Sequence, residues 1–276
     1  MSAPPLAAVV ATHRKISKKV IWERRLKDRI PGVVSFIAFL AIWQAVIWIW
    51  DIRPVLLPGP GLVWDALVES ISDGTMWPAV TDSMYAMSIG LVWALVVGIP
   101  LGLLIGMSPT TDLLTSPYLW GFFAMPRIAL APIIILWLGF GAETKIMLVF
   151  LSAVIPLMLS CKDGVQTADP SLIDAARSFG ANKFDVFAKI IAPGTLPFIA
   201  SGIRNGISRG FVGLLVIELT VGSGGIGTQV MRSMRNFDTA RMFAFAGVLI
   251  VFAMILIGIS RRLENYASRW REEVKV

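Results

Sequence analysis

Long apolar runs alternate with shorter polar segments along most of the 276-residue chain. The runs carry little charge, and an α-helix of about 20 apolar residues crosses the hydrocarbon core of a bilayer. We therefore predict six membrane spans, the fourth of them short, at residues 31–50, 84–107, 118–138, 145–160, 195–221 and 240–259. This pattern is typical of an all-α membrane protein with about six transmembrane helices.

The polar segments divide the chain into three predicted parts: a basic N-terminal segment at 1–30, a transmembrane domain at 31–260 and a polar tail at 261–276. The first is too long and too charged for the n-region of a cleaved signal peptide, so we expect it to stay attached. A short amphipathic helix is predicted at 61–70, before the second span. A turn at 108–117 is predicted to join the second span to the third.

The third span contains two prolines, Pro126 and Pro132. Proline lacks an N–H and clashes with the preceding helical turn, so we expect this span to be broken or kinked. A break at membrane depth is tolerated only where the freed backbone groups are buried in protein or line a wet cavity. The third span is therefore predicted to face the protein interior.

Composition excludes a soluble protein, because 56% of the residues are hydrophobic, 16% are charged and the mean hydropathy is +0.73. A water-soluble domain cannot bury that much apolar surface. The one cysteine, Cys161, excludes an intrachain disulfide and a cysteine-based metal cluster, and the one histidine, His13, is assigned no chemistry. No metal site is predicted.

The net charge of +7 predicts membrane orientation and no nucleic-acid partner, because the basic residues flank apolar runs instead of interleaving with aromatic residues. Seventeen Lys and Arg residues lie in the first thirty residues, in the loop 161–193 and in the tail. The opposite loops hold three, namely Arg53, Arg232 and Arg235. Cytoplasmic loops are enriched in Lys and Arg, so both termini and the loop 161–193 are predicted to be cytoplasmic.

That cytoplasmic loop, between spans four and five, is predicted to form two short helices. Asp169 is placed to cap the first helix, and Gly180 to end it in a left-handed conformation. Asn182 is placed to cap the second helix, and Pro193 is predicted to end it. Both helices carry apolar positions at the membrane surface, which indicates that they bind a partner.

The loop sequence DAARSFGANKFDVFAKIIAP resembles the EAA loop of binding-protein-dependent ABC importer permeases, which reads Glu-Ala-Ala, three residues, Gly, nine residues and Ile-x-Leu-Pro. The matching positions are Asp174, Ala175, Ala176, Gly180, Ile190 and Pro193. Asp174 stands for the glutamate of the motif and Ala192 for its leucine. Neither change disturbs the helix, the glycine stop or the proline.

More of the chain, from about residue 54 to the tail, resembles the branch of that family that carries taurine, alkanesulfonates, nitrate and related small anions. The similar segments are LLPGP, 129–146 and 196–230. The resemblance implies a six-span type I importer permease in the bacterial cytoplasmic membrane. It also implies a second permease copy, two cytoplasmic ATPase subunits and an external binding protein that delivers the substrate. The branch usually pairs identical copies, and a pairing with a different permease stays open.

The resemblance places the ATPase contact on the loop 162–193. The coupling residues that it implies are Asp174, Ala175, Ala176, Arg177, Phe179, Gly180, Ala181 and Phe184. The chain has no G-x-x-x-x-G-K-[ST] phosphate loop, so ATP and Mg²⁺ are expected on the partner ATPase and no cofactor on this chain. The GSGGIG segment at 222–227 follows a span and opens no βαβ unit, so no nucleotide site is predicted there.

Charged residues inside membrane spans are costly and must face protein or water. Four are predicted in this chain, namely Arg127, Arg204, Arg209 and Glu218. Arg127 and Arg209 lie near the middle of their spans, where two guanidinium groups could attract an anion. We therefore predict that they line the path of a small anionic substrate of the sulfonate, nitrate, bicarbonate or carboxylate type. Salt bridges, or caps on broken backbone, are the alternative role for these residues.

Two other classes of membrane protein compete with a transporter subunit, with an integral receptor component as a third. A membrane-embedded enzyme needs a nucleophile or a metal set, and the spans contain no His pair, no carboxylate pair at helical spacing and no G-x-S-x-G. An ion channel has no need of the EAA loop. Dependence of transport on ATP hydrolysis by a co-purified subunit separates the channel from the importer.

Overall fold

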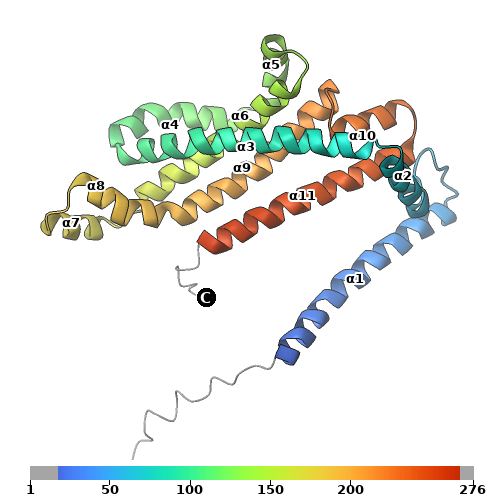
Figure 1. The fold of residues 1–276 in the computed structure, drawn as a ribbon, viewed down its shortest axis with the longest axis horizontal. Helices are drawn as coiled ribbons and strands as arrows, with labels where there is room; N and C mark the ends of the chain where they lie inside the picture. The colour runs from blue at the N-terminus through green and yellow to red at the C-terminus, as the bar shows by residue number, and fades with distance from the viewer. Residues whose placement is uncertain (1–17, 268–276) are drawn as a thin grey trace, which may run out of the picture. The chain divides into compact units, whose positions relative to one another are not determined.

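A computed structural model describes the backbone of residues 18–267 and the side chains of 30–126 and 129–265 (Figure 1). The described residues form helices and connecting turns without a strand, which confirms the all-α prediction. The helices are α1 Lys18–Ile49, α2 Pro60–Ser72, α3 Met76–Met107, α4 Pro109–Ala124, η2 Arg127–Leu130, α5 Ala131–Leu138, α6 Ala142–Gln166, α7 Pro170–Ser178, α8 Lys183–Val186, η3 Phe187–Ile191, α9 Ala192–Val221, α10 Ile226–Arg235 and α11 Thr239–Ala267.

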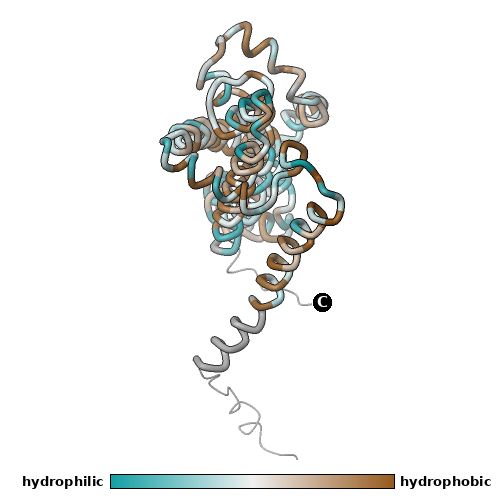
Figure 2. Tube along the Cα trace, turned by 90° about the vertical axis from the view of Figure 1, so that its right-hand side faces the viewer, coloured by the Kyte–Doolittle hydropathy of each residue, from teal (hydrophilic) through white to brown (hydrophobic). Residues whose placement is uncertain are grey.

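Five of the six predicted spans lie in helical stretches that are long and apolar enough to cross a membrane, as the brown residues along them illustrate (Figure 2). The stretches are Ile30–Ile49, Met76–Met107, Ala142–Gln166, Lys183–Arg235 and Thr239–Asn265. The second and fourth predicted spans were too short, because their helices continue into more polar sequence. The chain divides into two compact units, Met1–Gly61 and Leu62–Val276, and α3, α6 and α9 belong to the second.

The third predicted span is broken, as expected. α4 ends at Ala124, Met125 is extended with φ −65° and ψ 131°, and η2 and α5 follow. A proline disfavours the helical conformation in the residue before it, so Pro126 ends α4. Pro132 lies in the first turn of α5, where a missing N–H costs nothing, and it breaks no helix.

The predicted turn at 108–117 is wrong, because α4 already begins at Pro109. The Ser108 side chain accepts a hydrogen bond from the Thr111 N–H at 3.3 Å, and proline is favoured at the first helical position. The polar residues of this segment therefore form the first turn of a helix. In the sequence they indicate a turn because they lie between two apolar spans.

α6 is the centre of this unit and packs between α3 and α9. Glycines recur along α3 and α9 where they face α6. A Cβ at Gly102 would lie 2.6 Å from the Met158 carbonyl oxygen, and one at Gly202 would lie 2.8 Å from the Ser160 Cβ. Small residues therefore allow close backbone approach, which replaces the hydrophobic effect as the source of helix association in a bilayer.

Pro193 does not end the second helix of the loop 162–193, contrary to the prediction. α8, η3 and α9 run on from Lys183 to Val221, with a π-helical turn at Phe187–Ile191. The Ala192 N–H donates to the Phe187 carbonyl, five residues back. The wider turn changes the hydrogen-bond pattern just before Pro193, which has no N–H to donate, and the helix continues through this proline.

Candidate functional site

A cavity of about 410 Å³ lies beside the break in the third span. Phe123, Ala124, Met125 and Pro126 form its wall at the break, Leu148 and Ser152 come from α6, and Arg209, Val212, Gly213 and Val216 come from α9. The break therefore opens onto a cavity, which agrees with the rule for irregular backbone at membrane depth. Arg209 is the cationic side chain among these lining residues.

The Arg209 guanidinium lies over the Phe123 ring, with its Cζ 4.3 Å from the ring centroid. This distance is that of a cation–π contact, in which the aromatic ring attracts the positive charge without accepting a conventional hydrogen bond from it. Among the described side chains, no carboxylate forms an ion pair with Arg209. The cavity wall therefore carries a cation that no described carboxylate neutralises.

Ser152 adds a second polar group that the sequence did not single out. Its hydroxyl is buried and has no hydrogen-bond partner among the residues whose side chains the structure describes. A Cβ at Gly213 would lie 2.5 Å from the Ser152 Oγ, so the hydroxyl is enclosed where α6 meets α9. A serine in an apolar span is usually a small packing residue, so no sequence signal distinguishes Ser152.

The other predicted pathway residues lie apart from this cavity wall or cannot be placed in it. Arg204 pairs with Glu264 of α11, with 3.2 Å between Nη1 and Oε2. The backbone of Arg127 begins η2, but its side chain lies outside the described residues. The structure therefore gives Arg204 a carboxylate partner and leaves the partners of Arg127 undescribed.

Glu218 is fully buried and holds the GSGGIG segment in place. Its carboxylate accepts hydrogen bonds from the Ser83 hydroxyl at 2.7 Å and from the Gly227 N–H at 2.8 Å. A Cβ at Gly225 would collide with this carboxylate. The glycines of this segment thus allow the chain to fold closely around a buried acid.

An ion pair that the sequence did not predict lies beside Glu218. Lys145 of α6 is fully buried and pairs with Asp82 of α3. Both residues stood at the ends of predicted spans, where charge is ordinary, so only the longer helices of the structure bring them inside. The pair, Glu218 and Ser83 join α3, α6, α9 and the start of α10.

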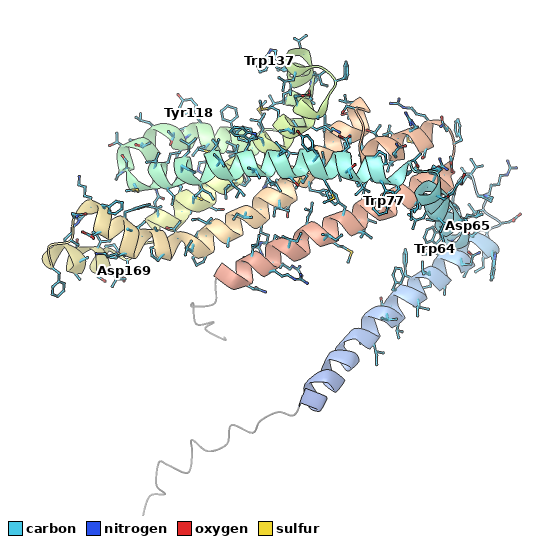
Figure 3. All side chains as sticks on the ribbon, in the orientation of Figure 1. Trp64, Asp65, Trp77, Tyr118, Trp137 and Asp169 are labelled. Atoms are coloured by element: carbon cyan, nitrogen blue, oxygen red, sulfur yellow. The ribbon has the colours of Figure 1, made fainter. Side chains whose placement is uncertain are left out.

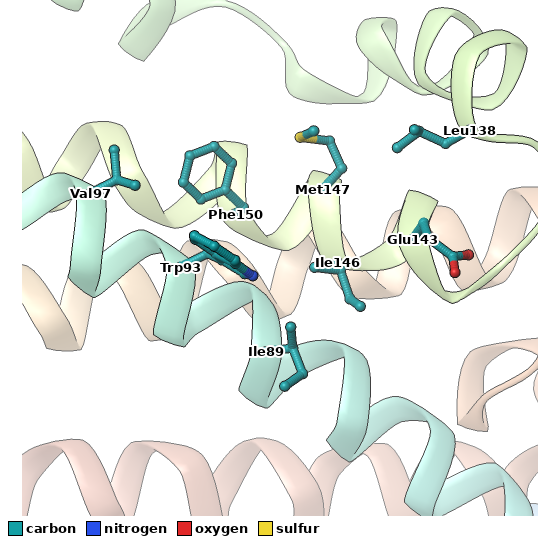
Figure 4. A pocket seen from close by; sticks show the side chains of 8 residues that line it. All are labelled: Ile89, Trp93, Val97, Leu138, Glu143, Ile146, Met147 and Phe150. Carbon is teal, nitrogen blue, oxygen red and sulfur yellow. The ribbon is translucent and has the colours of Figure 1, made fainter.

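A second cavity, of about 360 Å³, lies between α3, α5 and α6 (Figure 4). Its walls are almost entirely apolar, with Trp93, Met147 and Phe150 close together and Glu143 at one edge. No cation lines it, so it offers nothing to hold an anion.

The loop 162–193 lies at one end of the long helices, and α10 lies at the other (Figure 1). Asp169, labelled in Figure 3, caps α7 by accepting a hydrogen bond from the Ser171 N–H at 2.8 Å. This bond, together with the Ser171 side chain, lowers the pKa of the Asp169 carboxyl. Asn182 caps α8 by accepting from the Asp185 N–H at 2.9 Å. Both predicted caps are confirmed.

Gly180 ends α7 with a φ of +85°, as predicted. The Gly180 N–H donates to the Arg177 carbonyl at 2.9 Å, and the Ala181 N–H donates to the Ala176 carbonyl at 3.0 Å. These two bonds are the pair that defines a Schellman motif. The motif fixes the direction in which the chain leaves α7.

Two aromatic side chains of this loop are strongly exposed. Phe179 is 92% exposed and Phe184 is 75% exposed, and α7 contains no buried residue. Of the other predicted coupling residues, Asp174 and Arg177 form a surface ion pair at 3.9 Å, Ala175 and Gly180 are exposed, and Ala176 and Ala181 are half-buried. The prediction that these residues contact an ATPase stays a prediction.

Known proteins resemble this chain over most of its length. The taurine transport system permease protein TauC of Escherichia coli (strain K12) is 28% identical in an alignment of 274 residues that covers 97% of this chain and 100% of TauC. The putative aliphatic sulfonates transport permease protein SsuC of Bacillus subtilis (strain 168) is 28% identical over 270 residues, covering 98% of this chain and 95% of SsuC.

The fold is similar to that in a solved inward-facing structure of the MetNI methionine ABC transporter. The TM-score is 0.60 at 17% identity, and the match covers 70% of this chain and 98% of that one. It confirms the predicted type I importer permease fold. Residues 98–267 match the family described as "Binding-protein-dependent transport system inner membrane component". This multi-pass membrane protein therefore belongs to that family, as the resemblance of the loop 162–193 predicted.

Proposed function

We propose that this permease subunit forms the path of a small anionic solute, with the cavity beside the broken third span as part of that path. The solute is delivered by an external binding protein, and a separate ATPase drives its passage. The observation that carries the proposal is the position of Arg209, which lines the cavity without a carboxylate partner among the described side chains.

An anion is the solute that this site fits best. A guanidinium presents parallel N–H groups that match the oxygens of a sulfonate, carboxylate or nitrate. A cation lowers the barrier for an anion in a low-dielectric wall only while its field is not already neutralised by a carboxylate. Arg209 meets that condition and Arg204 does not. The names of the two sulfonate-related relatives point to the same class of solute.

The loop around α7 is the proposed contact with the ATPase. Its capped ends make α7 rigid, while Leu172, Phe179 and Phe184 remain exposed. Exposed aromatic side chains on a rigid helix at a membrane surface suit a protein groove. We further propose that two ATPase subunits and a second permease copy complete the transporter. We also propose that both termini are cytoplasmic, since the Lys and Arg residues concentrate in the two terminal segments and in the loop 162–193.

The proposal is tested by comparing Arg209→Gln with Arg204→Gln in vesicles that contain the full complex and its binding protein. The transported solute is first identified by ligand binding to that external protein. We expect Arg209→Gln to slow uptake about 10-fold or more, because a hydrogen bond to a charged group contributes about 1.5–3 kcal/mol. Thermal melting and basal ATPase activity should stay near those of the unaltered complex.

Arg204→Gln is the matched control, since it removes the same charge from the same helix at a paired position. It should leave the rate of uptake per folded complex nearly unchanged. Unchanged uptake with Arg209→Gln would refute the pathway role. A binding protein that accepts only neutral solutes would refute the anion assignment.

A further inference from the structure

A polar network ties the first turn of α4 to the last turns of α6. The Asp112 Oδ1 accepts a hydrogen bond from the Lys162 Nζ at 3.0 Å, and its Oδ2 accepts from the Gln166 Nε2 at 2.7 Å. The Ser116 hydroxyl donates to Asp112 and accepts from the Lys162 Nζ at 3.0 Å. One carboxylate thus gathers three donors from two helices.

The network is shielded from solvent on its Lys162 side, whereas Gln166 at its other end is exposed. The Lys162 side chain is only 7% exposed and that of Asp112 is 25% exposed. Loss of the carboxylate would leave a buried ammonium group without its partner, which strongly destabilises the folded protein. Breaking this pair is therefore more costly than breaking a surface pair. Leu119, further along α4, packs into the same cluster as Ala153 and Met158 of α6. α4 is therefore attached to α6 at its start and along its length.

The attachment between α4 and α6 lies close to the α7 loop at one end and to the Phe123–Arg209 wall of the cavity at the other. Gln166 is the last residue of α6, and α7 begins at Pro170, four residues later. Phe123 lies eleven residues after Asp112 on α4, about 16 Å away at about 1.5 Å per residue, and its ring lies under Arg209. A single helix thus connects the base of the α7 loop with the Arg209 wall of the cavity.

We infer that Asp112 is a positioning residue that makes α4 move with the cytoplasmic end of α6, so that displacement of the α7 loop reaches the Phe123–Arg209 wall. This inference rests on the proposed function, because it assigns the link between the ATPase contact and the solute path. It requires no contact between Asp112 and the solute.

The test is Asp112→Asn in the full complex in vesicles, with uptake and ATP hydrolysis measured together. We expect solute moved per ATP hydrolysed to fall at least 5-fold, while ATPase activity stays above about half. A merely structural role would lower both in proportion to the amount of assembled complex, leaving the ratio unchanged. An unchanged ratio in well-assembled complex overturns the inference.

Asp163→Asn is the matched control, because it removes a charge beside Lys162 from an exposed side chain that makes no hydrogen bond in the network, and it should leave the ratio nearly unchanged. If Asp112→Asn fails to assemble, Gln166→Ala removes one hydrogen bond without exposing Lys162, and it should lower the ratio about 2-fold. The exchange Asp112→Lys with Lys162→Asp should restore most of the ratio. The inference is overturned if Gln166→Ala does not lower the ratio of solute moved per ATP hydrolysed and the exchange does not restore it.

The outcome separates this inference from the proposed function. A lowered ratio in Asp112→Asn together with normal uptake in Arg209→Gln would keep the link and reject the anion path. The reverse pair of results would keep the path and reject the link.

Discussion

Gly180 takes a backbone conformation that a β-branched residue adopts only with strain. Its φ is +85°, and a Cβ there would meet open space, so backbone strain alone decides the effect of a substitution. We expect Gly180→Val to cost about 1–2 kcal/mol in the α7 stop and to reduce both co-purification of the ATPase and ATP-dependent uptake.

Gly180→Asn is the control, because asparagine enters the left-handed region more readily than other non-glycine residues. It should retain most of the co-purified ATPase. Full uptake and normal co-purification with the valine variant would contradict the role assigned to this loop.

Single residues also mark how far the sequence can predict the site. The position of Arg209 in an apolar span was sufficient to select it, because a charge there is costly. Its neighbour Phe123 was not selected, since an aromatic residue in an apolar run is usually part of the core. The partner of Arg204 lies 60 residues away, on α11. Such a pairing depends on how the helices pack, which a single sequence does not contain.

At the scale of elements, the contact of α3 with α6 depends on small residues. A Cβ at Gly102 would lie 2.6 Å from the Met158 carbonyl and 2.7 Å from the Cys161 Cβ, and neither group is a flexible side-chain end. We expect Gly102→Ala to destabilise the protein by about 1–3 kcal/mol, as overpacking does elsewhere. Thermal melting of the detergent-solubilised protein measures the effect.

Gly247 of α11 is the matched position, because a Cβ there would meet nothing within 4 Å. Gly247→Ala should leave the melting temperature unchanged or slightly raised, since alanine is the better helix former. Equal melting of the two variants would show that close approach at Gly102 is not what holds α3 to α6.

The stability that the polar network between α4 and α6 contributes should depend on pH. Hydrogen bonds from Ser116, Lys162 and Gln166 lower the pKa of the Asp112 carboxyl to about 2. A group whose pKa is lowered by folding stabilises the folded state above its unfolded pKa, about 3.9 for aspartate, and this contribution is lost as pH falls towards the folded value. The melting difference between the unaltered protein and Asp112→Asn should therefore be constant above about pH 5 and shrink between about pH 4 and pH 2.

Elements differ in how well the sequence predicts them. Apolar runs predicted the five long helices, and turn residues predicted α2, α7 and the start of α8. α10 was missed because its sequence, IGTQVMRSMR, is short and mostly polar. Its position depends on Ile226, which is buried in the core, and on the bond from Gly227 to Glu218. The π-helical turn before Pro193 has no local signal that separates it from a helix end.

At the scale of the whole molecule, the sequence predicted the fold class and the family, since hydropathy and one loop motif are sufficient for both. It did not predict which polar residues meet inside. Asp82, Lys145, Asp112 and Lys162 stood near the ends of predicted spans, where charged residues face water. Because the helices extend further than the apolar runs, these residues instead form pairs between helices.

The broken third span has a consequence for how the chain enters the membrane during synthesis. α4 has 16 residues and α5 has 8, so each is shorter than the stretch of about 20 apolar residues that crosses a bilayer by itself. Ile30–Ile49 is long enough to pass from the translocon into the bilayer by itself, whereas α4 and α5 are expected to insert together with α3 or α6. The stretch whose break lies beside the Arg209 cavity is therefore the one whose insertion depends most on helices made before and after it.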